Sequence, residues 1–285
     1  MFMLKPILDS LYRTFNCEDN DSKDEIQREV RKAYYELCGA TSWEHLRDSI
    51  LFAYNEGVDG MWLPADLIDV DCVSDGEHLW SQTSMSGALN YRCAAKLWYI
   101  AEHNRTPLVA GKGIKISDGS KTFTGAPEIT AAMTGEYIRI GSQSGAYKLA
   151  SATTLETPYY GAKQISGTFS VRPIGTKRIK LLTEDAQTDA TPATIFFHRF
   201  PAQLYSDDQP VMLPRSDILE LAVKEKMFDI TLQTDLKNSV QKDLYGSKGR
   251  YEGKLQKAIA ENPDFVPPVT PLNRTGQPAG WGARR

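Results

Sequence analysis

The sequence predicts an α+β fold: a helical bundle with an antiparallel sheet, an inserted small all-β module and an extended C-terminal arm. Three observations support this class. Apolar residues recur at helical spacing near the start of the chain and again after Pro214. Residues 108–172 are rich in Gly, Ser and Thr and alternate like short strands, and residues 263–285 contain five prolines.

Two helices are expected first. The earlier one has an apolar face made of Leu4, Ile7, Leu8, Leu11 and Phe15. The later one is SKDEIQREVRKAYYELCG, from Ser22 to Gly39, in which Ser22 and Glu25 fit a capping box and Gly39 marks the end. Its apolar residues at helical spacing are Ile26, Val30, Ala33, Tyr34 and Leu37.

Short apolar runs follow Trp43 and predict antiparallel strands. They are SILFAY and MWLPADLIDVDCV, with Pro64 near a strand start or a sheet edge. The segment ALNYRCAAKLWYIAEHN permits either a strand pair or a short helix, because its apolar residues fit both periods.

The next region is expected to be an insertion into the body. GIKIS, KTFTG, EYIRIG, AYKLAS and GTFSVRP read as short strands of a compact all-β module. We therefore divide the chain into a first part of the body at 1–107, the inserted module at 108–172, a second part of the body at 173–262 and an extended docking arm at 263–285.

The body resumes with two strands, KRIKLLTED and ATIFFHRFP, and then a helix after Pro214. A long helix is expected from Asp235 to Glu261, because apolar residues follow one face. Gly246, Gly249 and Gly253 weaken it by about 1 kcal/mol each relative to alanine, which indicates either close contact with another backbone or a local break.

The proline-rich end cannot form a helix or a central strand by itself. Its prolines remove backbone donors and favour an extended polyproline conformation. Two interpretations stay open: the arm packs on its own domain, or it docks on a neighbouring subunit or another protein. Extended, 23 residues at about 3.1 Å each reach on the order of 70 Å.

Composition excludes several classes of protein. The 285 residues carry a net charge of −3, which argues against a protein whose main task is to grip nucleic acid. No apolar run reaches the length of a membrane span, and the first residues lack the pattern of a signal peptide. The four cysteines form no CxxC pair, so reduced thiols are expected.

Between Asp48 and Tyr91 the chain has no Lys or Arg but many acids. This stretch sums to about −8, which predicts either a strongly negative face or a merely solvated one. The acids of interest are Asp59, Asp66, Asp69, Asp71, Asp75 and Glu77.

No catalytic, cofactor-binding or metal-binding residue is predicted, and the chain is not expected to be an enzyme. GSQSG places Gln143 where a nucleophile elbow needs serine. The four histidines form no zinc motif, and Val73 interrupts a partial calcium loop. Paired carboxylates stay possible, as does a sugar platform on the β module, although such aromatics are more often core residues. The aromatics in question are Tyr137, Tyr147, Tyr159, Tyr160 and Phe169.

Three stretches occur in an order typical of one family. EIQREVRKAYYELCGATSWEHLRDS (residues 25–49) has a helix and a trailing W..L segment, and MWLPADLIDV (61–70) has an LPAD strand start. IFFHRFPAQLYSDDQPVMLPRSDILELAV (195–223) joins a strand, a proline turn and a helix start. With the β segment TGEYIRIGSQSGAYKLASATTLETPYYG (134–161), they resemble the head-to-tail adaptor proteins of tailed bacteriophages, also called connector or head-completion proteins.

The resemblance implies a structural virion protein of the neck, assembled in the host cytoplasm. Such proteins form a ring, usually of twelve copies, that joins the portal protein to a tail tube or nozzle protein. Double-stranded DNA passes through the ring without sequence-specific binding. No cofactor and no membrane are implied. The alternative function is a cell-wall or carbohydrate-active protein that uses the inserted β module.

Two groups of residues receive roles under this reading. A portal-docking arm is assigned to Phe265, Pro267, Pro268, Arg274, Trp281, Arg284 and Arg285. Trp281 and the final arginines are expected to carry most of the binding energy, since interface energy concentrates in tryptophan and arginine. The six acids named above become a channel wall that repels the DNA backbone during passage.

Overall fold

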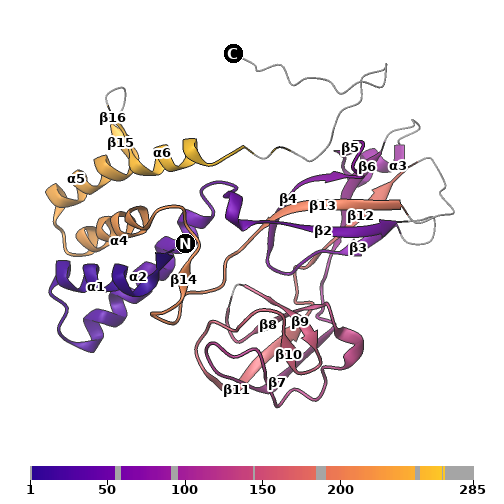
Figure 1. Ribbon diagram of the computed structural model, residues 1–285, viewed down its shortest axis with the longest axis horizontal. Helices are drawn as coiled ribbons and strands as arrows, with labels where there is room; N and C mark the ends of the chain where they lie inside the picture. The colour runs from indigo at the N-terminus through magenta and orange to yellow at the C-terminus, as the bar shows by residue number, and fades with distance from the viewer. Residues whose placement is uncertain are drawn as a thin grey trace.

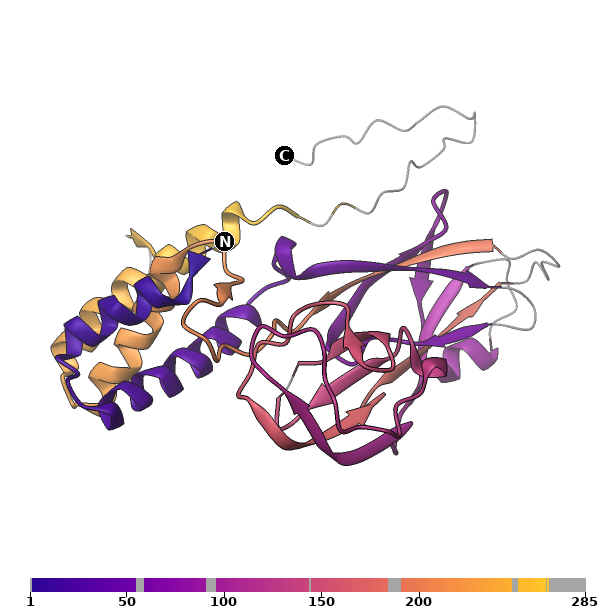
Figure 2. The ribbon, with the colours of Figure 1, turned by 60° about the horizontal axis from the view of Figure 1, so that its bottom comes forward.

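The computed structural model describes residues 2–54, 59–90, 96–143, 145–183, 191–247, 251–264 and 266. These residues build a helical unit and two separate sheets, and each of the three has its own cluster of buried apolar side chains. The helices lie at one end of the molecule and the two sheets lie beside each other at the other end (Figures 1 and 2).

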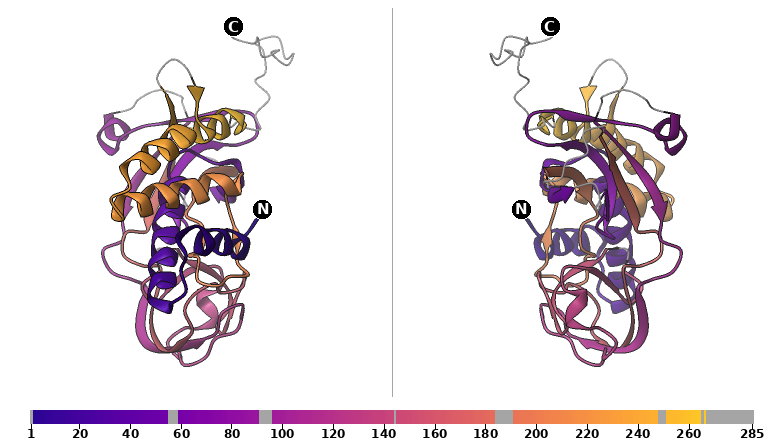
Figure 3. Two further views of the ribbon diagram at one scale, coloured as in Figure 1. Left: turned by 90° about the vertical axis from the view of Figure 1, so that its left-hand side faces the viewer. Right: turned by 90° about the vertical axis from the view of Figure 1, so that its right-hand side faces the viewer.

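The helical unit joins the first and last thirds of the chain. Its helices are α1 (Leu4–Phe15), α2 (Asn20–Cys38), α4 (Ser216–Ile230), α5 (Thr234–Tyr245) and α6 (Lys254–Glu261). The strands β1 (Phe2–Met3) and β14 (Pro210–Val211) pair antiparallel beside them. Viewed from the helical end, α4 lies between α1 and the outer pair α5 and α6 (Figure 3).

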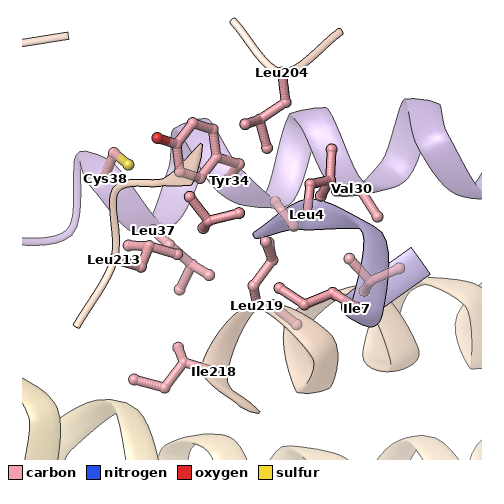
Figure 4. Close-up of a cluster of buried hydrophobic side chains, with 14 of the residues drawn as sticks. Leu4, Ile7, Val30, Tyr34, Leu37, Cys38, Leu204, Leu213, Ile218 and Leu219 are labelled. Carbon is pink, nitrogen blue, oxygen red and sulfur yellow. The ribbon is translucent and has the colours of Figure 1, made fainter. Parts of the chain in front are cut away.

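The core of this unit explains the helical spacing of its apolar residues. Leu4 and Ile7 of α1, Tyr34 of α2 and Leu219 of α4 converge (Figure 4), and all four are buried. The cap of α2 differs from the prediction. Asp19, not Ser22, is the N-cap, and its carboxylate accepts from the backbone N–H of Ser22 at 2.7 Å.

The expected helix from Asp235 to Glu261 is broken. α5 ends at Tyr245, a hairpin of β15 (Gly246–Ser247) and β16 (Tyr251–Glu252) follows, and α6 then begins at Lys254. Gly246 has a φ of 87°, and a Cβ on Gly253 would lie 2.4 Å from the backbone N of Gly246. The glycines therefore provide both a break and a close backbone contact.

The larger sheet has seven strands. Its order is β2 (Arg47–Tyr54), β13 (Thr191–Arg199), β4 (Leu67–Ser74), β5 (Leu79–Gln82), β6 (Leu97–His103), β12 (Lys177–Leu182) and β3 (Gly60–Trp62). All pairs are antiparallel except β5 with β6. Its core includes Val73, Ile179 and Phe197, and the rings of Tyr54 and Trp80 meet edge to face at 5.1 Å.

The segment ALNYRCAAKLWYIAEHN, whose apolar residues fitted both a helix and a strand, contains the end of a helix and a strand. The short helix α3 (Met85–Asn90) precedes β6, and residues 91–95 lie outside the described part. A single turn of 3-10 helix, η1 (Glu44–Leu46), leads into β2.

The smaller sheet is a nearly closed barrel. Its order is β10 (Thr154–Leu155), β9 (Tyr147–Ser151), β8 (Tyr137–Ile140), β11 (Gln164–Val171) and β7 (Val109–Ile116), with the 3-10 turn η2 (Ala131–Met133) beside it. Bridges from Lys115 to Thr124 and from Thr122 to Thr154 connect the two edge strands. Ile138, Leu149 and Val171 are fully buried inside.

The predicted class, an α+β fold whose body is a helical bundle with an antiparallel sheet, is wrong. About 32% of the described residues are helical and 33% are in strands, so the protein is rich in β structure and its largest element is the mixed seven-stranded sheet. The error has a physical reason. A helix can be predicted from the local spacing of its apolar residues. The pairing of β2 with β13 joins residues that are more than a hundred positions apart, so no local sequence pattern predicts it.

Candidate functional site

The three stretches that carry the family resemblance meet in space. They contribute β2, β4 and β13, and β13 lies between the other two in the sheet. His198 is paired in register with Arg47 of β2 on one side and with Asp69 of β4 on the other. Because alternate side chains of a strand point to opposite faces, His198 and Arg199 begin two different clusters.

Arg199 joins the stretches on one face. Its guanidinium donates to Asp48 Oδ2 at 2.9 Å and pairs with Asp66 Oδ2 at 2.8 Å. Asp66 lies in the turn before β4, where its carbonyl accepts from the backbone N–H of Phe200. One residue from each stretch therefore enters a single charged cluster, the Asp48–Asp66–Arg199 cluster.

Asp66 is the most perturbed member of this cluster. Its side chain is 1% exposed, and within the described residues its Oδ1 has no hydrogen-bond partner. Burial raises the pKa of Asp66 to about 6, although Arg199 opposes the rise. Burial also raises the pKa of the neighbouring Tyr137 on β8, and the charge of Asp66 adds to that effect.

His198 belongs to the opposite face. Its Nδ1 lies 3.2 Å from Oδ1 of Asp71, which is the extra residue of a bulge in β4. The hydroxyl of Ser42 donates to the same carboxylate oxygen at 3.5 Å. Serine therefore contacts the carboxylate and not the imidazole, so these three side chains are not arranged for general-base activation of a nucleophile.

The start of the C-terminal arm is held at the same place. Asn262 accepts from the backbone N–H of Glu44 at 3.0 Å and donates to the carbonyl of Ser42 at 3.1 Å. Arg47 donates to the carbonyl of Pro263 at 3.1 Å and to the carbonyl of Ser42 at 2.8 Å. The point at which the arm leaves the body is thus tied to η1 and β2.

A cavity of about 310 Å³ lies where the helical unit and the two sheets meet. Tyr34 and Met212 line it from the helical unit, Tyr147 and Tyr160 line it from the barrel, and the Asp48–Asp66–Arg199 cluster lines it from the larger sheet. Cavities between structural units are common places for ligands to bind.

The six acids proposed as a channel wall lie in varied surroundings. Asp59 pairs with Lys180 at 2.9 Å, Asp66 pairs with Arg199, and Asp71 contacts His198. Asp75 pairs with Lys96. Burial alone would raise the pKa of Asp75, but hydrogen bonds from Lys96 and from two backbone N–H groups outweigh it and hold the pKa at about 2.

Asp69 and Glu77 differ from the other four acids. Both are exposed, and no ion pair joins either of them to a cation in the described part of the chain. A lysine or arginine therefore pairs with three of the six acids, and a histidine contacts a fourth. A role of any of the six in a channel stays a prediction.

The arm residues proposed for docking lie outside the described residues. They are Phe265, Pro267, Pro268, Arg274, Trp281, Arg284 and Arg285. The aromatics considered for a sugar platform are described, and Tyr147, Tyr159 and Phe169 are buried in the barrel core. Among the described residues no group of three or more His, Cys, Asp or Glu is placed to hold a metal ion, and no helix is long and apolar enough to cross a membrane.

No protein-family model matches this chain, and no curated protein is similar enough to count as a match. The site residues that sequence reasoning missed are Arg199 and Asp48. One signal pointed to Arg199: the apolar strand IFFHRF contains two consecutive polar residues, His198 and Arg199, and a charge within a buried strand needs a partner.

Proposed function

We propose that this chain is a structural virion protein that forms a ring between portal and tail and continues the DNA channel, as the resemblance to head-to-tail adaptors implies. The observation that carries the proposal is an apolar surface left open on the helical unit. It comprises Ile230, Leu232 and Leu236 at the end of α4, in the turn and at the start of α5, with exposed fractions of 51%, 87% and 49%.

This α4–α5 surface is hard to explain in a monomer. α5 has twelve residues, and only Leu244 among them is buried. A helix of this length is marginal in water and depends on packing for its stability. A second copy of the chain that covers the outer side of α5 would supply that packing, and repetition of the contact around an axis would give a closed ring.

The position of the arm supports a second contact. Asn262 and Pro263 are fixed to Ser42, Glu44 and Arg47, so the arm begins at a defined point of the body. A segment rich in proline that begins at a rigid point is suited to reach a neighbouring protein, which is the portal in this proposal. Asp69 and Glu77, which form no ion pair within the described part of the chain, are the best candidates for a wall that repels DNA.

The mass of the assembly tests the ring. In native mass spectrometry the purified chain, alone or with its cognate portal protein, should give a closed oligomer of about twelve copies. Leu232→Lys and Leu236→Lys should shift it to monomers without loss of helical circular dichroism. Ile165→Lys is the matched control, because Ile165 is 71% exposed but lies on the barrel. A wild-type chain that stays monomeric with portal present would refute the proposal.

The arm is tested separately. Removal of residues 265–285 keeps Asn262 and Pro263 in place, so the fold should be retained. The shortened chain should fail to attach to portal rings in a pull-down while the full chain attaches. Normal attachment of the shortened chain would remove the docking role from the arm and leave the ring proposal standing.

A further inference from the structure

The outer face of β2, which points away from the core of the larger sheet, is open and partly apolar. Ile50 and Phe52 pack against that core. Alternate side chains of a strand point to opposite faces, so Ser49, Leu51 and Ala53 belong to the outer face. All three are exposed, and the exposed fraction of Leu51 is 70%. A large apolar side chain in this position would gain stability from a cover.

The neighbouring strand β13 extends this face. Ile195 and Phe197 are fully buried in the core, so Phe196 between them lies on the outer side. Phe196 is half-buried and is paired in register with Ser49. Leu51 follows two residues after Ser49 on the same side of β2. Ser49, Leu51 and Phe196 therefore form one continuous surface, the outer β2–β13 face.

The C-terminal arm begins on this same side. Arg47 stands two residues before Ser49 in β2, and its guanidinium donates to the carbonyl of Pro263 at 3.1 Å. The preceding residue, Asn262, accepts from the backbone N–H of Glu44. Successive residues at the start of the arm thus contact successive positions of the body. The chain advances toward β2, which runs from the helical unit along the larger sheet (Figure 1).

The spacing of an extended arm matches the spacing of side chains on this face. Two residues of a strand advance about 6.6 Å. Two residues of an extended proline-rich chain advance about 6 Å. Counted from Pro263, Phe265 therefore reaches the level of Phe196. Pro267 reaches the level of Leu51.

The prolines decide how such a segment can bind. Pro267 and Pro268 lack the N–H that a strand donates, so the arm cannot add to the edge of β2 as a regular strand. Proline rings pack instead on aromatic and aliphatic side chains, as in the aromatic-lined grooves that recognise proline-rich segments. Val266 is 66% exposed, so the contact is assigned to the residues on either side of it.

We propose that residues 265–269 of the arm, FVPPV, pack on the outer β2–β13 face of their own chain. Phe265 contacts Phe196, and Pro267 covers Leu51. The surface and its occupant belong to one chain, so the contact depends neither on the ring nor on the portal. The role of binding a partner then falls to the residues of the arm after 269.

Two truncations of the chain, studied without portal, test the contact. Removal of residues 265–285 should lower the melting temperature by about 2–4 °C, whereas removal of residues 270–285 should leave it unchanged. Phe265→Ala in the full chain should reproduce most of the fall. Trp281→Ala, which also removes an aromatic ring from the arm, is the matched control and should have no effect. Equal melting temperatures for the two shortened chains would overturn the proposal.

A pair of introduced cysteines locates the contact and identifies the chain that supplies the arm. Leu51→Cys combined with Pro267→Cys should form a disulfide within one chain under mild oxidation, identified by mass spectrometry of the peptides. Ile165→Cys combined with Pro267→Cys is the control, because Ile165 is 71% exposed but lies on the barrel. No disulfide in the first pair, equal cross-linking of both pairs, or a disulfide that joins two chains would overturn the assignment.

Discussion

Ionisation of Asp66 should make the protein less stable as the pH rises, which is the opposite of most carboxylates. The folded pKa of about 6 lies above the ordinary value of 3.8 for an aspartate. The folded state therefore holds the proton more tightly than the unfolded chain does. By linkage, stability is greatest below the unfolded pKa and is lost as the pH rises through the folded one.

The size of the effect follows from the shift. A difference of about 2 pKa units corresponds to about 3 kcal/mol over the full range. Between about pH 4.5 and pH 7.5 about 2 kcal/mol of this is lost, because some of the change falls at lower pH. Asp66 is nearly inaccessible to solvent, so screening by water and salt reduces the effect little.

Urea unfolding of the wild type and of Asp66→Asn at several pH values isolates this contribution. The free energy of unfolding of the wild type relative to the variant should fall by about 2 kcal/mol from pH 4.5 to pH 7.5. Asp59→Asn is the control, because it removes a carboxylate that is 44% exposed, and its curve should run parallel to the wild type. Parallel curves for the wild type and Asp66→Asn would show that the buried carboxylate titrates normally.

Three further predictions test other features of the structure. Arg199→Met leaves the carboxylate of Asp66 buried and unpaired and should lower the free energy of unfolding in urea by about 3–5 kcal/mol. Asp48→Asn, at a half-exposed carboxylate, should lower it by under about 1 kcal/mol. Equal costs for the two variants would contradict the proposed cluster. Asp75→Asn should make the free energy of unfolding depend less on pH in acid, measured by fluorescence. The low pKa of Asp75 gives stability that is present above about pH 4 and is lost as the pH falls toward about 2. An unchanged pH dependence in this range would contradict the prediction. Gly125→Ala should destabilise the barrel by about 2 kcal/mol or more, because φ is +77° and the new Cβ would meet the carbonyl of Gly113. Gly119→Ala, at φ +73° with open space around it, should cost only about 1 kcal/mol. Hydrogen exchange of the barrel amides distinguishes the two costs.

Local signals were sufficient for α1, α2 and several single strands, but they did not settle the break between α5 and α6. The helix predicted from Ser22 to Gly39 is α2, and the face with Leu4 and Leu11 is buried in α1. Sequence reasoning did not reach the arrangement of the strands, because pairing partners such as β12 and β3 are distant in the chain. Closure of the barrel was also out of reach, since it depends on two single bridges made by residues 122–124.

The candidate site shows the same limit in its chemistry. From the sequence, Asp66 was selected only as one of several acids in a stretch without lysine or arginine. That selection considers only the charges that are neighbours along the chain. In the fold its partner Arg199 comes from more than a hundred residues later, and the pairing makes Asp66 a buried group and not part of an open negative face. Charge along a chain predicts a surface potential only where the charged side chains stay exposed.

The Asp48–Asp66–Arg199 cluster also helps to fix how three separate stretches of the chain are arranged relative to one another. A buried ion pair contributes little net stability compared with apolar packing, but it penalises arrangements in which its partners fail to meet. Here the partners come from β2, from the turn before β4 and from the end of β13, and on the opposite face Ser42 and Arg47 hold the first residues of the arm. A one-residue slip of β13 would move Arg199 to the other face and leave Asp66 unpaired. The cluster therefore fixes the register of the strands at the place where the arm leaves the body, which sets the direction from which the arm can reach a partner.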